Sequence, residues 1–381
     1  MKIAFLAPEY PHPNMVGHAG GIGTSILNLG KALSQLGHTI SVLVYGQQED
    51  AYFVEDGIHF YKIKNVKIKG LSLILTQKKV ERSINSLYDS GKIEIVEAPD
   101  WTGFTAFIKP KCPLVIRENG SDTYFCYLDN RKVKYKNKFL ERRALKKADG
   151  IISVSAYTGN LTNELLGLNK KFTVIPNSID ASVFVTEQNN SKKLTILYFG
   201  TLIRKKGLLE LPEIFNIVHE TNKEVELILV GRDSGDIKSG SASTWQLMQP
   251  LFNESAIKKV TYLGAVDYFK IRDLISNATV CVFPTFAEAL PVSWLEAMAM
   301  EKAIVASNIG WAREMIEDGK EGFLVHPTNH EEYAARILEL LKNPFKQQAF
   351  GKAARQKVKA QFSHDLVAKQ SVAFYKTLVT S

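Results

Sequence analysis

Two glutamates stand eight positions apart in one of the most apolar parts of the chain, Glu288 and Glu296 in FPTFAEALPVSWLEAMAMEKAIVAS (283–307). The pattern predicts a buried strand that ends at Pro284, then a helix capped by Ser293, with Glu296 in its first turn. Unpaired N–H groups there attract an anion, and carboxylates accept hydrogen bonds from sugar hydroxyls. The two glutamates thus suit a ligand with two sugars and an anionic group between them, one carboxylate for each sugar. The pattern alone favours the simpler alternative, in which Glu296 only stabilises the helix dipole.

Cationic residues follow two predicted strands of the second half. Arg204, Lys205 and Lys206 come after the first strand in YFGTLIRKKGLLEL, and Arg232 follows the next strand in LVGRDSGD. Positive charges at the carboxyl ends of parallel strands fit a pyrophosphate group. The alternative for the triplet is a solvated run of charges.

A glycine-rich stretch, AGGIGTS (19–25), lies near the N-terminus. It lacks the third glycine of the dinucleotide fingerprint and lies about a dozen residues beyond the first strand, so we reject dinucleotide binding. Gly21 and Gly23 are predicted to lie in a flexible loop whose N–H groups lead into a helix and can hold an anion. A plain glycine-rich cap explains the stretch equally well. The chain has no G-x-x-x-x-G-K-[ST] motif, which excludes a P-loop.

Short apolar runs that alternate with amphipathic stretches predict an α/β fold. Strands are predicted at 2–7, 39–45, 93–98, 113–118, 150–155, 194–200, 225–231, 260–264, 278–284, 303–307 and 322–327, and clear helices at 22–37 and 330–343. The polar stretch 187–193 is the best linker candidate. We therefore predict two Rossmann-like doubly wound parallel-sheet domains, 1–185 and 186–381, that face each other across a ligand-binding cleft.

The chain has 381 residues and a formal net charge of +9, with the basic excess in its N-terminal half. This charge suits an anionic partner, although a lysine-rich surface explains it equally well. Three separated cysteines and the absence of a tight histidine cluster predict a reducing compartment without structural zinc. The apolar run at the start of the sequence is too short for a secretory signal. No apolar run is long enough to span a bilayer.

The region around the two glutamates, TFAEALPVSWLEAMAM, resembles the E-x7-E motif of the retaining GT-B glycosyltransferases of family 4. The other resembling stretches follow in the family's order: GGIGTSILNLGKALSQLGH, IISVSAYTGNLTNELLGLNKKFTVIPNSID, GTLIRKKG, VTYLGAVDYFKIRDLISNATVCVFPT and SNIGWAREMIEDGKEGFLVHPTN. The resemblance covers nearly the whole chain. It implies a GT-B fold with an N-terminal acceptor domain and a C-terminal donor domain, and a last helix, about 361–381, that packs back on the first domain.

The resemblance implies a role for each motif residue. Glu296 would bind the ribose hydroxyls of a nucleotide sugar, Glu288 the hydroxyls of the transferred sugar, and Lys206 the departing diphosphate. Backbone amides of Leu290 and Val292 would hold sugar and phosphate, since Pro291 has no N–H. The remaining donor-binding positions are Gly21, Gly23, Arg204, Arg232, Tyr262 and Ala289. No metal ion or other cofactor is expected, because cations of the chain supply the positive charge.

The chain departs from the family pattern at several positions. The family's first phosphate-binding arginine is Thr201 here, so Arg204 or Arg232 would have to replace it. The family's histidine after the fourth strand of the first domain is Asn119. We group Asn119 with Glu288 and Lys206 as catalytic, although an amide can only bind a sugar hydroxyl and cannot transfer a proton.

The resemblance predicts a hexosyltransferase that uses a UDP-sugar, with glucose as the expected sugar, and a saccharide or lipid-linked acceptor in polysaccharide or glycoconjugate synthesis. No nucleic-acid partner is expected, and the expected location is the cytoplasm. The basic stretch RKVKYKNKFLERRALKK (131–147) could contact anionic lipid at the inner face of a membrane, or be a solvated helix face. A nucleotide-sugar epimerase of the same architecture and a non-catalytic nucleotide-sugar-binding module remain alternatives.

Overall fold

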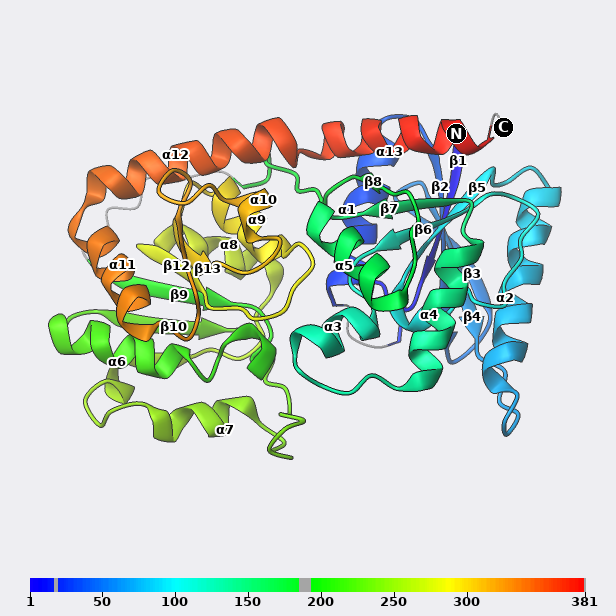
Figure 1. Cartoon of the computed structure of the whole chain (residues 1–381). Coiled ribbons are helices and arrows are strands. Elements are labelled where there is room, and N and C mark those ends of the chain that lie inside the picture. The colour runs from blue at the N-terminus through cyan, green and yellow to red at the C-terminus, as the bar shows by residue number, and fades with distance from the viewer. Residues whose placement is uncertain (17–19, 185–192, 380–381) are drawn as a thin grey trace. The chain divides into compact units, whose positions relative to one another are not determined.

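The computed structural model describes residues 1–16, 20–184 and 193–379. The chain divides into two units (Figure 1): unit 1 comprises Met1–Ile179 and Phe362–Ser381, and unit 2 comprises Asp180–Gln361. This division lies a few residues before the boundary predicted at 185/186. The predicted linker, 187–193, falls outside the described residues except at its last position.

Unit 1 contains an eight-stranded sheet in the order β3-β4-β2-β1-β5-β6-β7-β8. Its strands are β1 (Lys2–Ala7), β2 (Thr39–Gln47), β3 (Ala51–Glu55), β4 (Ile58–Lys64), β5 (Ile95–Pro99), β6 (Leu114–Glu118), β7 (Gly150–Ser153) and β8 (Thr173–Val174). All neighbours pair in parallel except β3 and β4, which form an antiparallel hairpin at the edge. The sequence prediction missed this hairpin, although the Asp56–Gly57 turn between its strands, with positive φ at both residues, is a strong hairpin signal.

Helices cover both faces of the unit 1 sheet. They are α1 (Gly21–Gln35), α2 (Ser72–Asp89), α3 (Asp122–Leu128), α4 (Tyr135–Lys147), α5 (Ala156–Leu166) and α13 (His364–Val379). Leu29 and Leu33 of α1 pack with Val367 and Tyr375 of α13 over β1 and β2, whereas α2 packs on the other face. The last helix thus belongs to the core of unit 1 although it is the most distant segment in the sequence.

A buried ionic network fixes α13 to the sheet. Arg117 of β6 contacts Glu97 of β5 at 2.7 Å, and the Tyr375 hydroxyl of α13 donates to the same carboxylate at 2.6 Å. Arg117 also donates to Ser371 of α13 and to the carbonyl of Ile175. Burial opposes the charge of Arg117, but Glu97 more than offsets this and raises the arginine's pKa.

Unit 2 contains a six-stranded, fully parallel sheet in the order β11-β10-β9-β12-β13-β14. Its strands are β9 (Thr195–Phe199), β10 (Glu226–Val230), β11 (Val260–Tyr262), β12 (Val280–Phe283), β13 (Ala303–Ser307) and β14 (Phe323–Val325). The helices are α6 (Leu211–Thr221), α7 (Thr244–Met248), α8 (Tyr268–Asn277), α9 (Val292–Ala299), α10 (Ala312–Met315), α11 (His330–Lys342) and α12 (Pro344–Gln361). The strand order reverses between β9 and β12, and ligands bind at such points, beyond the carboxyl ends of the strands.

Candidate functional site

Lys206 is positioned by a compact turn after β9. The turn Arg204–Lys206 is a single 3₁₀ turn, and it ends at Gly207 with φ +72°. A Cβ atom at Gly207 would lie 1.7 Å from the carbonyl oxygen of Pro284, at the end of β12. Only glycine permits both this conformation and this approach. The β9 turn and the β12 loop are therefore in direct backbone contact.

Lys206 and Glu288 form an ion pair at this junction. The lysine Nζ lies 3.1 Å from Oε1 of Glu288, and both side chains are about four-fifths buried. The pKa of Tyr198, whose hydroxyl lies next to the turn, is raised by burial and then by the charge of Glu288. The structure thus brings together two of the three side chains predicted to be catalytic.

The loop that carries Glu288 is anchored on the N-terminal side of this residue. The backbone N–H groups of Phe286 and Ala287 donate to the carbonyl of Lys205 at 2.9 and 3.2 Å. At the strand end, the buried Tyr333 hydroxyl of α11 accepts from the N–H of Phe283 and donates to the carbonyl of Val305. The carboxylate of Glu288 is therefore held by a loop with little freedom to move.

Glu296 lies on α9, the helix that follows this loop, and its side chain is buried. The predicted cap was wrong: Pro291 is the N-cap of α9, and Ser293 lies inside the helix. Glu296 lies beyond the first turn rather than within it. Because no side chain of the described residues caps α9, its first N–H groups are available to an anion.

The two arginines near Lys206 have different surroundings. Arg204 binds Asp236 through two hydrogen bonds of 2.8 and 2.7 Å, and this contact lowers the pKa of the aspartate. Arg204 is therefore engaged within the unit. Arg232 follows Gly231 on β10 and is exposed, and no ion pair of Arg232 is found among the described residues. Of the two arginines proposed to replace the family's arginine at Thr201, Arg232 has the more available charge.

Tyr262 lies at the end of β11. Its hydroxyl donates to the carbonyl of Gly231 at 2.9 Å, and its ring packs on Trp245. Gly231 in turn approaches the β9 turn so closely that a Cβ atom would lie 1.9 Å from the carbonyl of Gly200. Tyr262 therefore supports the loop that bears Arg232.

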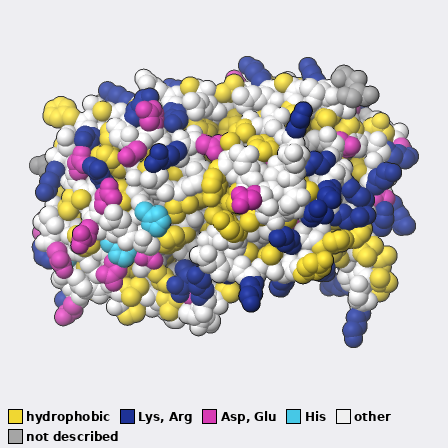
Figure 2. All heavy atoms as spheres, in the orientation of Figure 1, with side chains coloured by type: hydrophobic (Ala, Val, Ile, Leu, Met, Phe, Trp, Pro, Cys, Tyr) yellow, Lys and Arg dark blue, Asp and Glu magenta, His cyan; other side chains and the backbone are white. Residues whose placement is uncertain are grey.

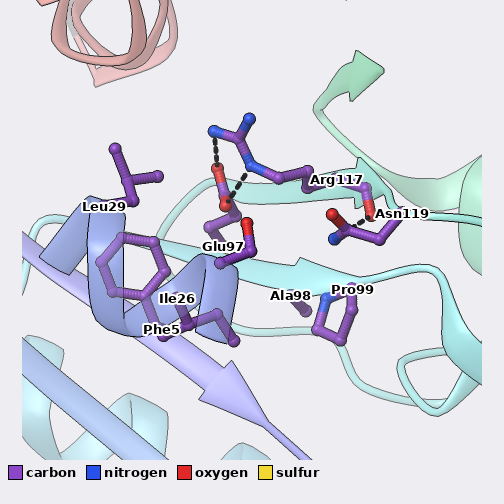
Figure 3. A pocket seen from close by; sticks show the side chains of 9 residues that line it. Phe5, Ile26, Leu29, Glu97, Ala98, Pro99, Arg117 and Asn119 are labelled. Atoms are coloured by element: carbon purple, nitrogen blue, oxygen red, sulfur yellow. Dashed lines mark hydrogen bonds and ion pairs between the residues drawn. The ribbon is translucent and has the colours of Figure 1, made fainter. Parts of the chain in front are cut away.

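Of the candidate residues of unit 1, Asn119 lines a pocket, and Gly21 and Gly23 do not (Figure 3). Asn119 follows β6 and lines this pocket together with Ser25, Ile26 and Leu29 of α1. The Glu97–Arg117 pair forms part of the same lining. Because Glu97 and Arg117 are engaged with each other and with α13, the Asn119 amide is the candidate ligand-binding group of this lining.

Gly21 and Gly23 lie in the first turn of α1, which corrects the predicted flexible loop. Residues 17–19 lie outside the described residues. The carboxylate of Glu9 accepts hydrogen bonds from the N–H groups of Gly20 and Gly23 at 2.7 and 3.2 Å. A carboxylate of the chain itself thus occupies part of the N-terminus of α1, and the predicted binding of an external anion there stays a prediction.

Two buried carboxyl groups, those of Asp100 and Glu118, lie next to Asn119. Asp100 accepts from the N–H of Asn119 at 3.1 Å, and burial raises its pKa to about 8. Burial and the neighbouring Asp100 also raise the pKa of Glu118. Each has one buried oxygen without a hydrogen-bond partner among the described atoms. The loop that carries Asn119 therefore rests on carboxyl groups that favour the protonated form.

Sequence reasoning missed Glu9, Asp100, Asp236 and Tyr333. Of these, Asp236 is the last residue of the quoted stretch LVGRDSGD, and the other three support the site from stretches for which no site role was predicted. No group of three or more His, Cys, Asp or Glu side chains is arranged to hold a metal ion in the described part of the chain. Among its helices, none is long and apolar enough to cross a membrane.

Two known families match the chain and together cover most of it. Residues 19–183 match the family described as Glycosyltransferase Family 4, and residues 182–357 match Glycosyl transferases group 1. This chain is a family 4 glycosyltransferase. The two matches meet within a few residues of the boundary between unit 1 and unit 2.

Characterised relatives of this glycosyltransferase differ in their activities. An alpha-maltose-1-phosphate synthase of Mycolicibacterium smegmatis is 24% identical over 410 residues, which cover 99% of each chain. The capsular polysaccharide biosynthesis glycosyltransferase CapM of Staphylococcus aureus is 24% identical over 259 residues, 63% of this chain and 64% of CapM.

Solved structures show that the glycosyltransferase has the GT-B fold. A sucrose-phosphate synthase of Thermosynechococcus elongatus matches with a TM-score of 0.80 and 20% identity over 99% of both chains. HepE of Anabaena, solved with UDP and glucose, matches with a TM-score of 0.76 and 19% identity over 99% of this chain and all of HepE. The predicted α/β class with two Rossmann-like sheets is confirmed.

Proposed function

We propose that this glycosyltransferase transfers a hexose from a UDP-sugar, with retention of configuration at the anomeric carbon. Glucose is the sugar we expect. The observation that carries the proposal is the ion pair between Lys206 and Glu288 beside the uncapped N-terminus of α9. A cation, a carboxylate and free N–H groups are the functions that a sugar linked to a diphosphate requires.

The proposed chemistry depends on the departure of the nucleoside diphosphate. As the glycosidic bond to phosphate breaks, negative charge grows on the diphosphate oxygens. Lys206 and Arg232 stabilise this charge, and the fixed backbone around Gly207 keeps Lys206 in place before the reaction begins. Because the cations come from the chain, we propose that the reaction needs no metal ion.

For the other residues we propose the roles that the resemblance to family 4 implies. Glu288 binds hydroxyls of the transferred sugar, and Glu296 binds the ribose. Asn119, Gly21 and Gly23 belong to unit 1, for which we propose acceptor binding and additional donor contacts. The complexes of HepE with UDP and glucose and of TarM with UDP support a nucleotide donor.

The acceptor we propose is a saccharide or a lipid-linked saccharide in the cytoplasm, and the product a polysaccharide or glycoconjugate. The support comes from CapM, a transferase of capsular polysaccharide biosynthesis, and from the glycogen synthase of Mycobacterium tuberculosis, which is 26% identical over 239 residues. Those 239 residues cover 62% of this chain and 56% of that synthase.

A panel of nucleoside diphosphates and their sugars, tested by thermal shift, identifies the donor, because a ligand that binds the folded state stabilises it. We expect UDP and UDP-glucose to give the largest increase in melting temperature. Glu296→Ala should weaken UDP binding by about tenfold or more through loss of the ribose contact. Glu331→Ala, on the exposed face of α11, is the matched control and should bind UDP as the wild type does.

The same preparation separates the alternatives. A transferase releases UDP slowly from UDP-glucose without an acceptor and faster with one. An epimerase would convert the donor without releasing UDP, and a binding module would leave it intact. Unchanged UDP affinity in Glu296→Ala would count against the proposed site.

A further inference from the structure

Unit 1 exposes an apolar tip that no other described part of the unit covers. The tip is the turn between β4 and α2, residues 66–74, in which Ile68, Leu71 and Ile74 are 50%, 52% and 43% exposed. In Figure 1 this turn projects from the end of unit 1 at which α2 begins. Single exposed apolar residues are ordinary, but three in one short turn mark a contact surface.

The tip is an ordered turn rather than a loose loop. The hydroxyl of Ser72 accepts from the N–H of Ile68 at 3.0 Å and donates to its carbonyl at 2.7 Å. The N–H of Leu71 also donates to the carbonyl of Ile68, and the N–H of Val66 donates to Thr76. These bonds satisfy backbone groups that would otherwise need water, as an apolar medium demands.

Basic and aromatic side chains lie beside the tip. Leu73, in the first turn of α2, packs against the hydrophobic cluster that contains Leu140 and Ala144 of α4. The first turns of α4 and the chain before it carry exposed cations, Lys132, Lys134, Lys136 and Lys138, and Lys67 and Lys69 belong to the tip itself. Tyr135 is 85% exposed. Figure 2 shows this gathering of basic side chains next to a hydrophobic area.

The charge of this surface is not balanced within unit 1. None of these six lysines forms an ion pair within 4 Å of a carboxylate in the described ranges, whereas Lys78 and Lys79 of α2 are both paired. Apolar side chains at a tip, aromatic side chains beside them and unpaired lysines around both form the pattern that binds the interface of an anionic bilayer.

We propose that residues 66–74 and the exposed face of residues 132–139 form a docking surface for an anionic lipid bilayer. The tip enters the headgroup region, and the lysines bind lipid phosphates. The lipid-docking claim rests on unit 1 alone, and only its use, the delivery of the enzyme to a lipid-linked acceptor, rests on the proposed function.

Co-sedimentation of the full chain with vesicles tests this surface. We expect binding to vesicles of phosphatidylcholine mixed with phosphatidylglycerol, but not to phosphatidylcholine alone, and weaker binding at high salt. A tip variant (I68S/L71S/I74S) and a lysine variant (K132Q/K134Q/K136Q/K138Q) should each lose at least about tenfold in partition coefficient.

Matched controls lie in unit 2. I237S/F345S removes two apolar side chains that are more exposed than those of the tip. K238Q/K342Q/K352Q/K359Q removes as many positive charges as the lysine variant of unit 1 does. Both should bind vesicles as the wild type does. UDP release from UDP-glucose in the absence of vesicles should be unchanged in all four variants, so that failure of docking is distinct from failure of the proposed function.

The proposal is wrong if the wild type does not bind the anionic vesicles, or if the control variants lose binding equally. It is also wrong if only the lysine variant loses binding, since attraction to the anionic headgroups would then suffice and the apolar tip would take no part. If the tip variant instead changes the oligomeric state with unchanged vesicle binding, the tip is an interface with a second copy of the chain.

Discussion

At the scale of single residues, the site consists of a few charged groups whose states are set by their surroundings. Lys206 and Glu288 neutralise each other at 3.1 Å, and Arg204 is engaged by Asp236. Arg232, which follows Gly231 just beyond β10, is exposed. A diphosphate that enters the site therefore meets one available arginine and one lysine that must share its charge between the ligand and Glu288.

Asp100 predicts a pH dependence of stability. Burial raises its pKa from 3.8 to about 8, so the folded chain keeps a proton that the unfolded chain loses as the pH rises. The free energy of unfolding should therefore fall between about pH 4 and pH 8 through this group. Asp100→Asn cannot ionise, and its urea unfolding should depend less on pH across this window.

The neighbouring carboxyls of Glu118 and Glu141 have raised pKa values and act in the same direction. The comparison with wild type therefore gives the share of Asp100 together with the part of the Glu118 shift that the charge of Asp100 causes. Identical pH slopes in the wild type and in Asp100→Asn would show that Asp100 is already ionised in the folded chain.

Residue types and local motifs were readable from the sequence, but their partners were not. Glu288 and Lys206 stand in recognisable patterns, and their pairing follows once β9 and β12 are neighbours. Asp236, by contrast, reaches Arg204 from an irregular loop, and Glu9 reaches α1 from the end of β1. Side-chain contacts of this kind depend on loop conformations that hydrophobic periodicity does not encode.

At the scale of elements, close backbone contacts hold the site together. One of these contacts is that of Gly207 with the carbonyl of Pro284, and a substitution at Gly207 would disturb it. Gly207→Ala places a methyl group against the carbonyl of Pro284 and strains a residue with φ +72°, so we expect a loss of at least about 2 kcal/mol in stability and weaker donor cleavage.

Gly240 provides the matched control, because its φ is +77° and a Cβ atom there meets nothing within 4 Å. Gly240→Ala carries the strain without the collision. Chemical denaturation of both variants should show the larger loss for Gly207→Ala, and equal losses would mean that the contact with Pro284 relaxes at no cost.

Most elements were predictable because buried parallel strands give continuous apolar runs. The strand predicted at 303–307 and the helix predicted at 330–343 match β13 and α11 within a residue. The β3–β4 hairpin was missed because its outer strand is largely exposed and β4 carries lysines among its apolar residues. The helix predicted at 22–37 begins within a residue of α1, but Gly21 and Gly23 were also predicted to lie in a loop, because glycines usually indicate one; here Glu9 accepts from the N–H groups of Gly20 and Gly23 at the start of the helix.

At the scale of the whole molecule, the chain returns to unit 1 after completing unit 2, and α13 closes the core of unit 1 through Tyr375. Tyr375→Phe removes the hydroxyl that donates to Glu97 and leaves part of a buried carboxylate unsatisfied. We expect unit 1 to lose about 1–3 kcal/mol in stability.

Hydrogen–deuterium exchange resolves this effect by region. Peptides of β5, β6 and α13 should exchange faster in Tyr375→Phe, and peptides from 195–361 should not change. Tyr135→Phe, which removes an exposed hydroxyl from α4, should leave all peptides as in the wild type. Uniform acceleration across both units would contradict the assignment of α13 to the core of unit 1.

The central claim is that Lys206 stabilises a departing nucleoside diphosphate, and the release of UDP from UDP-glucose measures it directly. We expect Lys206→Ala to lower kcat by about 10²–10³-fold with a small change in UDP affinity, and Lys205→Ala, which keeps the carbonyl that fixes the Glu288 loop, to remain close to wild type. UDP release by Lys206→Ala at the wild-type rate would contradict the claim.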